Sequence, residues 1–209
     1  MKYSRIISLA LFLGLLGLGV WGLARGGFGK DEVAPTLAAG SFLQLDYIKE
    51  DSTIKAELAQ AERKALLWDS NAKLVAISMR FDGGLDYDFL KRYAYVFQTP
   101  GISDYYVFNS AKAVAAAQTY SQAELFGEVQ PTEITKDYLK INFVQALEIV
   151  ERAGGSTFRA DHSGNYIVNL LLVQPEGDVL SWVVSYQAKS SDESQVWRVN
   201  AASGSVELQ

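Results

Sequence analysis

The second half of the chain shows an apolar pattern that changes from helical to strand spacing. Asn142 is a good helix N-cap with Gln145 three residues later, which is the arrangement of a capping box. The apolar residues that follow are spaced for one face of a helix: Phe143, Ala146, Leu147 and Val150. Gly154 and Gly155 predict its end.

After this helix and a polar turn, the pattern predicts strands. Residues 166–173 form a β-branched and aliphatic run, and residues 179–187 alternate strictly. One face of the alternating segment carries Leu180, Trp182, Val184 and Tyr186, and the other carries Ser181, Val183, Ser185 and Gln187. We expect the first face to be buried and the second to be wetter. A third strand is expected around Trp197 and a short last one at 205–208.

The first half follows the same order less regularly. A helix is expected within residues 41–68, with a stripe at Ile54, Leu58, Ala61 and Ala65. Strands are expected at residues 73–81, 93–98 and 105–109.

The two halves also match residue by residue at one offset of 89 positions. Leu58, Glu62 and Arg63 then meet Leu147, Glu151 and Arg152, while Tyr93, Phe97 and Gln98 meet Trp182, Tyr186 and Gln187. Such self-similarity is typical of a duplicated supersecondary unit.

The N-terminus is a candidate membrane segment. Residues 6–24 are uncharged and apolar, and as a helix they would be roughly 28 Å long, close to the thickness of a bilayer core. The positive charges before this run outnumber Arg25 and Lys30 after it, which favours a chain whose bulk lies outside the cell membrane. Cleavage after Ala24 would instead release a secreted protein. Residues 26–40 then resemble a flexible spacer.

Composition excludes several classes of function. The chain of 209 residues has 19 Lys and Arg against 24 Asp and Glu, without a basic run beyond its first residues, so nucleic acid is not an expected partner. Because cysteine is absent, disulfides, iron–sulfur clusters and cysteine-based zinc sites are excluded. We expect no cofactor.

The residues that could carry chemistry are few. His162, the only histidine, lies between Asp161 and Ser163, but adjacent residues in a turn cannot converge as a catalytic triad does. Asp82, Asp86 and Asp88 could ligate calcium, yet their spacing is not that of an EF-hand, and solvated turn residues are the favoured interpretation: DGGLDYD. No catalytic, cofactor-binding or metal residue is therefore assigned.

Large aromatic residues offer a third candidate, a ligand-stacking platform. Their alternation places them in the core instead, between helix and sheet: Tyr93, Tyr95, Phe97, Trp182, Tyr186 and Trp197. Tyr105, Tyr106 and Tyr120 have no clear assignment.

The second half resembles the PepSY family of small extracytoplasmic domains. The resemblance lies in FVQALEIVERAGG from Phe143, IVNLLLVQPEGDVLSWVVSYQ from Ile167 and VWRVNAASGSVEL from Val196. The family tends to end in an Asp-Ala-x-Thr-Gly-x-Val turn, in which this chain has Asn200 for the acid and Ser203 for the threonine. The resemblance implies a helix packed on an antiparallel sheet and a binding or regulatory role, and no catalytic group.

Together these patterns predict an α+β protein with an N-terminal transmembrane helix and two tandem helix-plus-antiparallel-sheet units, the second PepSY-like. The expected divisions are 1–25 as anchor or signal, 26–40 as spacer, 41–128 as the first unit and 129–209 as the second. The expected function is non-catalytic, extracytoplasmic recognition of a polypeptide or envelope component, including modulation of a protease, by strand addition to a sheet edge. The alternatives are a structural scaffold in an envelope or secretion assembly and an enzyme with an unrecognised site.

Overall fold

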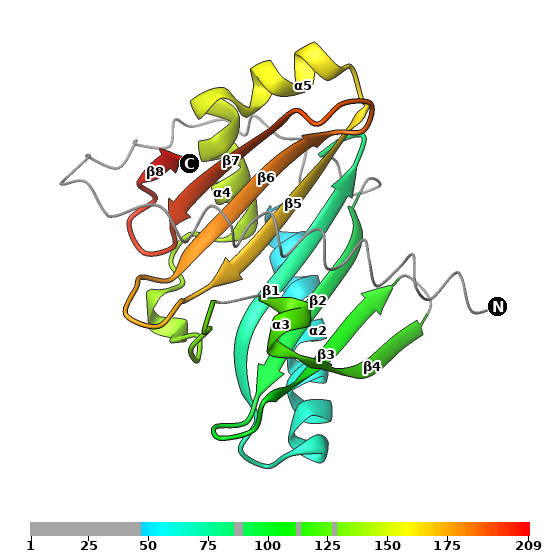
Figure 1. Cartoon of the computed structure of the whole chain (residues 1–209), viewed down its shortest axis with the longest axis vertical. Helices are drawn as coiled ribbons and strands as arrows, with labels where there is room; N and C mark the ends of the chain where they lie inside the picture. The colour runs from blue at the N-terminus through cyan, green and yellow to red at the C-terminus, as the bar shows by residue number, and fades with distance from the viewer. Residues whose placement is uncertain (1–46, 86–89, 112–113, 127–128) are drawn as a thin grey trace.

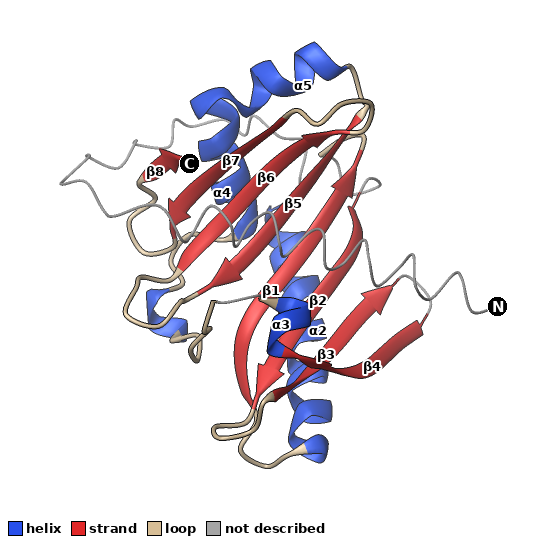
Figure 2. Cartoon of the chain, viewed as in Figure 1, coloured by secondary structure: helices blue, strands red, loops and turns tan. Residues whose placement is uncertain are grey.

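A single antiparallel sheet of eight strands organises the protein. The structure is a computed structural model, and it describes residues 47–85, 90–111, 114–126 and 129–209. The strands lie in the order β4-β3-β2-β1-β5-β6-β7-β8. Figure 1 shows α2 and α4 behind this sheet and α3 in front of it, and Figure 2 shows the same view by type of element.

The first half of the chain supplies the long helix α2, the short helix α3 (Gln122–Leu125) and the first four strands of that order. Helix α2 spans Tyr47–Trp68, and the strands are β1 (Lys73–Asp82), β2 (Leu90–Gln98), β3 (Asp104–Ala111) and β4 (Val114–Ser121). Ala61 and Ala65 are fully buried at helical spacing, and Leu58 packs partly against the same core. The predicted stripe of α2 is therefore confirmed at these three residues, and small alanines let the helix lie close to the sheet. The side chain of Ile54 lies outside the described residues.

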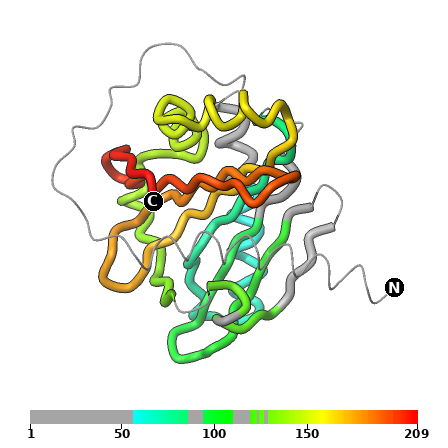
Figure 3. Tube along the Cα trace, turned by 45° about the horizontal axis from the view of Figure 1, so that its top comes forward, coloured from blue at the N-terminus to red at the C-terminus, as the bar shows by residue number. Residues whose placement is uncertain are grey.

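The second half supplies α4 (Phe143–Val150), the π-helix η3 (Glu151–Gly155), α5 (Ser156–His162) and the strands β5 (Tyr166–Val173), β6 (Ser181–Ala188), β7 (Ser194–Asn200) and β8 (Val206–Leu208). The predicted capping box is confirmed, since Asn142 Oδ1 accepts from Gln145 N and Gln145 Oε1 accepts from Asn142 N, both at 2.9 Å. Figure 3 shows α4 and α5 along one side of these strands.

The predicted end of that helix at the glycine pair is confirmed, because Gly154 has a non-helical φ of 140° that interrupts the helix. A further helix, α5, which the sequence did not predict, begins directly after the pair and continues to His162. Phe158, which is buried in the core, anchors α5 against the sheet. This helix ends where Ser163 takes the left-handed conformation at φ 41°.

The prediction of two tandem helix-plus-sheet units is wrong, because the strands of both halves form one sheet. β1 pairs with β5 in antiparallel register from Ala76 opposite Val173 to Asp82 opposite Ile167. Ile77, Met79 and Phe81 of β1 lie in the same core as Leu172, Leu170 and Val168, their partners in β5. The pairing of β1 with β5 therefore joins the two predicted units into one sheet.

The transmembrane helix predicted in that fold lies at residues 6–24, outside the described residues. Within the described part of the chain, no helix combines the length and apolar character needed to cross a bilayer.

The face of the sheet opposite α2 and α4 carries a second core, which the sequence did not predict. Val75, Val96, Tyr105, Val107, Leu125, Phe126, Leu171 and Val183 belong to it. Leu125 is the last residue of the short helix α3 (Gln122–Leu125), and Phe126 follows it directly. Ser181, Val183 and Ser185, expected on a wetter face, are accordingly buried at 1–5% exposure.

The chain closes with a tight turn that Asn200 stabilises. Asn200 Oδ1 accepts hydrogen bonds from Ala202 N at 2.9 Å and Ser203 N at 3.0 Å. Gly204, at φ 77°, then returns the chain, and its N–H donates to Asn200 O. The side-chain amide oxygen of Asn200 therefore fixes the turn through two backbone N–H groups.

Because one sheet joins both halves, a core cavity in β5 should destabilise them together. We expect Leu170→Ala, at a fully buried residue paired with Met79, to lower the free energy of unfolding of the full chain in mild detergent by about 2–5 kcal/mol. Urea unfolding followed by circular dichroism measures this loss. Hydrogen exchange should show β2 and β6 losing protection equally.

The matched control is Leu67→Ala, at a residue 88% exposed, which should change stability by less than about 0.5 kcal/mol. Loss of protection confined to β6 and β7 in Leu170→Ala would contradict a single cooperative sheet.

Candidate functional site

A cavity between α2 and α4 is the larger of two that the described residues line side by side, and it is the candidate site. Its volume is about 380 Å³, within the range of small-ligand and side-chain pockets. The lining is mostly apolar, with Leu58, Ala59 and Glu62 from α2, Leu74, Ile77 and Met79 from β1, Ile134, Lys136 and Leu139 from the segment before α4, and Asn142, Phe143 and Trp182. We call it the inner cavity.

A second cavity of about 220 Å³ lies next to it, towards the end of α2, and we call it the outer cavity. Both cavities are lined by Glu62, Leu74, Ile134 and Lys136. The outer cavity adds Leu66, which is 52% exposed, and the rim of Phe97. The two cavities adjoin, and together we call them the α2–α4 groove. The inner cavity is mostly apolar, whereas the outer cavity combines apolar side chains with four charged ones.

An ion pair spans the groove where the two cavities meet. Lys136 Nζ, in the 3-10 helix η2 (Lys136–Tyr138), lies 2.6 Å from Glu62 Oε1 on α2. A second pair, Lys73 with Glu133 at 3.6 Å, lines the outer cavity. The groove therefore presents acids and bases in equal number, each acid beside a base.

The wall opposite α2 is the linking segment, residues 129–142, and backbone hydrogen bonds fix its position. Ile134 N donates to Leu74 O at 2.8 Å, which ties the segment to the start of β1. Thr132 N donates to Gln174 O at 2.7 Å, which ties it to the end of β5. The hydrogen bonds to β1 and to the end of β5 therefore fix this wall of the groove in position.

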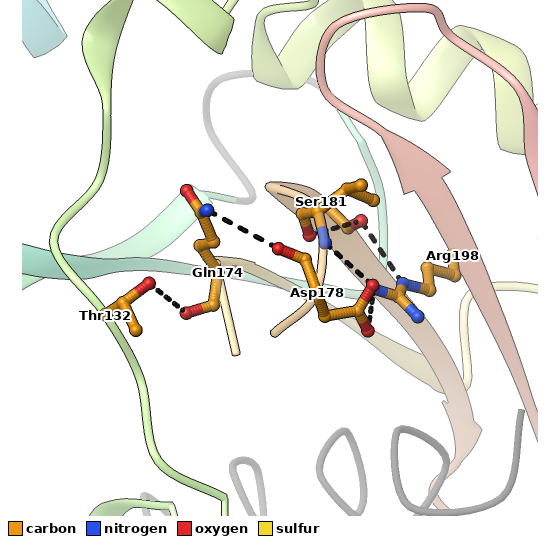
Figure 4. Close-up of polar contacts among 6 residues, drawn as sticks. Thr132, Gln174, Asp178, Ser181 and Arg198 are labelled. Carbon is orange, nitrogen blue, oxygen red and sulfur yellow. Dashed lines mark hydrogen bonds and ion pairs between the residues drawn. The ribbon is translucent and has the colours of Figure 1, made fainter. Parts of the chain in front are cut away.

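Polar side chains extend this support as far as β7, as Figure 4 shows. Thr132 Oγ1 donates to Gln174 O at 3.0 Å, and Gln174 Nε2 donates to Asp178 O at 3.4 Å. Arg198, whose side chain is only 4% exposed, then pairs with Asp178 Oδ2 at 2.6 Å and donates from Nε to Ser181 Oγ at 3.2 Å. Because a charge this buried needs its partner, Arg198 fixes the turn between β5 and β6 on which the linking segment rests.

The α4 end of the groove is held by Trp182. Its indole Nε1 donates to Ile141 O at 2.8 Å, while Ile141 N and Lys140 N both donate to Ala201 O. Trp182 therefore both lines the inner cavity and positions the chain that enters α4.

The aromatic residues predicted for the core are buried. Tyr95, Phe97, Trp182, Tyr186 and Trp197 are each at most 2% exposed, while the side chain of Tyr93 lies outside the described residues. Phe97 and Trp182 nevertheless reach the outer and inner cavities. Of the unassigned tyrosines, Tyr105 and Tyr106 are buried on opposite faces of β3, and Tyr120 packs partly against the second core.

His162 is the last residue of α5, and its contacts are structural. Its Nδ1 lies 2.7 Å from Phe158 O, its ring stacks on Phe158 at 4.2 Å, and its Nε2 lies 3.3 Å from Glu193 Oε2. Neither Asp161 nor Ser163 is among these partners. The described contacts therefore match a helix end anchored to the loop between β6 and β7.

The carboxylates considered for calcium are not brought together in the described structure. Asp82 ends β1 and forms an ion pair with Lys189, while Asp86 and Asp88 lie outside the described residues. Among the residues whose positions are described, no group of three or more metal-ligating side chains occurs.

A buried polar network at the π-helix was not predicted from sequence. Glu151, fully buried, accepts from Tyr186 Oη at 2.6 Å and from Arg159 Nε at 2.9 and 3.0 Å. Burial, and then the Glu151 carboxylate, raises the pKa of Tyr186 well above its usual value. Arg159 lies in α5, a helix that the sequence analysis did not predict, so this pairing could not be found from the sequence.

Chemically, the groove can enclose apolar groups and offer paired charges at its mouth. The buried network at Glu151 satisfies its own members and lies under α5, away from the residues that line the groove. Comparison with protein-family models, with curated proteins and with solved structures finds no match.

The tight packing of the network predicts an unusual response to alanine at Gly155. Its backbone is helical, at φ −57°, so alanine would normally favour the helix by about 1 kcal/mol. A Cβ there would lie 3.0 Å from Glu151 Oε1 and from Cζ and Oη of Tyr186. We therefore expect Gly155→Ala to destabilise the protein by about 1–3 kcal/mol in urea unfolding.

The control is Thr157→Ala, an exposed position in the same helical segment, which should be close to neutral. A Gly155→Ala variant more stable than the parent would show that the network is loosely packed.

Alkaline pH should weaken the fold through Tyr186. Its pKa is raised in the folded state, so below the usual tyrosine value of 10.0 both states are protonated and stability is unaffected. Above that pH the unfolded chain loses the proton first, and the free energy of unfolding falls by up to about 1.4 kcal/mol per pH unit for this group. Tyr186→Phe should flatten the slope above pH 10 in denaturant titrations, with Tyr138→Phe, at an exposed tyrosine, as the control. Equal slopes in the two variants would contradict the assignment.

Proposed function

We propose that this protein is a non-catalytic binding module that recognises a polypeptide through the α2–α4 groove. The observation that carries the proposal is the groove itself, with its mostly apolar inner cavity and a wall that is held in place by hydrogen bonds to two strands. Hydrophobic clefts with a few placed polar groups are the usual form of ligand sites.

The chemistry of the lining supports binding over reaction. The ionisable residues that line the inner cavity are Glu62 and Lys136, and they pair with each other at its mouth. The floor below them is aliphatic and aromatic, with Ile77, Met79 and Phe143 all at most 3% exposed. Apolar side chains of a ligand that cover this floor stabilise the complex by about 25 cal/mol for each Å² of apolar surface removed from water.

The location we propose is extracytoplasmic, and it rests on the sequence. The apolar run at residues 6–24 and the charges around it support delivery across a membrane, and the resemblance of residues 143–208 to PepSY domains supports a regulatory partner such as a protease. Strand addition at an edge of the sheet is a second contact mode. Within the described strands β4 and β8 form the two edges, and β4 is the longer.

The two rival functions predict different results. A scaffold in an envelope assembly would be recovered from solubilised membranes in one large complex, independently of the groove. An enzyme would lose its catalytic activity when Glu62 or Lys136 is replaced. Loss of peptide binding on blocking the groove, without either of these effects, distinguishes the binding module.

A bulky residue at the mouth of the groove should block binding without damaging the fold. Ala59 is exposed on α2 and lines the inner cavity, so Ala59→Trp can cover the opening with an indole. We expect this variant to weaken peptide binding at least tenfold, because apolar side chains lose access to the floor. The measurement is fluorescence polarisation of labelled seven-residue Gly/Ser peptides that carry one, two or three leucines, with the full chain in lipid nanodiscs.

The matched control is Ala160→Trp, at an exposed position on α5 away from the groove, which should bind as the parent does. Equal weakening in both variants, or no binding to the parent above that to empty nanodiscs, would overturn the proposed function.

A further inference from the structure

We infer that the ligand is an extended polypeptide segment that opens the Glu62–Lys136 ion pair and places one apolar side chain in each cavity. The inference rests on the proposed function, since it names the class of ligand that the same groove takes. Its starting point is that the two cavities share four lining residues, Glu62, Leu74, Ile134 and Lys136.

These four shared residues separate the two cavities, and they form a partition with a fixed base and a movable top. Leu74 and Ile134 form the base, and the hydrogen bond from Ile134 N to Leu74 O at 2.8 Å holds their backbones together. The top is made of two long side chains, from α2 and from η2, that meet across the groove at 2.6 Å. Only the top can move without disturbing the sheet.

Opening the top costs little. The Lys136 side chain is 63% exposed and that of Glu62 33% exposed, and an exposed ion pair is worth at most about a factor of five in an equilibrium constant. Burying a single methylene group offsets this, since it contributes about a factor of four. A ligand with two leucine side chains therefore gains far more than the pair costs.

The separated charges select a peptide group. Once apart, the Lys136 ammonium needs a hydrogen-bond acceptor and the Glu62 carboxylate needs a donor. The C=O and N–H of a polypeptide backbone supply one of each, whereas an alkyl chain supplies neither. The groove's second acid–base pair, Lys73 with Glu133, leaves no net charge to attract an ionic ligand.

The segment must be extended, because a helical ligand uses its own N–H and C=O groups internally. In an extended segment, side chains two residues apart lie on the same side about 7 Å from each other, and the peptide groups between them stay available. Two apolar side chains separated by one residue can then enter the two cavities while the backbone between them meets Glu62 and Lys136.

A double-mutant cycle tests this contact. The probe is the fluorescein-labelled Gly/Ser peptide with two leucines separated by one serine, and its analogue carries an ester in place of the amide after the first leucine, which removes one N–H. With the full chain in nanodiscs, we expect the ester to bind about tenfold more weakly to the parent, as loss of a hydrogen bond to a charged group predicts. In Glu62→Ala the two peptides should differ by less than twofold.

Glu193→Ala is the control, because Glu193 is an exposed carboxylate that lines neither cavity, so the tenfold difference should stay intact. The two-leucine peptide should also bind the parent more tightly than its one-leucine counterpart. An ester effect that persists in Glu62→Ala overturns this inference, and so does equal binding of the one-leucine and two-leucine peptides to the parent. If Ala59→Trp still weakens binding at least tenfold in that case, the groove remains the binding site. Absence of binding to the parent overturns both proposals.

Discussion

The antiparallel pairing of β1 with β5 determines the rest of this structure. It places α2, which precedes β1, and α4, which precedes β5, on the same face of one sheet. Below the two helices, Ile77 and Met79 of β1 form part of the floor of the groove. If the halves folded as separate units, these helices would have no common floor, and neither cavity would exist in its present form.

Local signals in the sequence predicted local structure well, and non-local pairing poorly. The bounds of β5 and the Asn142 capping box follow from nearest neighbours, and the structure has both. The strand β4 was missed because its VAAAQTYS sequence is rich in alanine, which favours helices. The fusion of the two halves was missed because apolar alternation predicts a strand but does not say which strand it pairs with.

The candidate site was beyond sequence reasoning for the same reason. Glu62 and Lys136 are 74 residues apart, and neither belongs to a motif that would single it out. Aromatic alternation correctly predicted buried rings, but it could not show that the edges of Phe97 and Trp182 reach cavities. The buried pairing of Glu151 with Arg159 depends on helix α5, whose existence the glycine pair argued against.

A groove with this lining is a departure from what packing alone would favour. The same fold fills the space under α4 and α5 with Phe158, Tyr186 and Trp197, whose rings meet at 5.2–5.9 Å. Between α2 and α4, the small Ala59 and the exposed Lys136 occupy the space that a large apolar residue could fill. Larger side chains there would bury more surface and stabilise the protein, so their absence has a cost in stability. Departures from local packing rules are expected at functional sites, and this is why we propose the groove as the binding site.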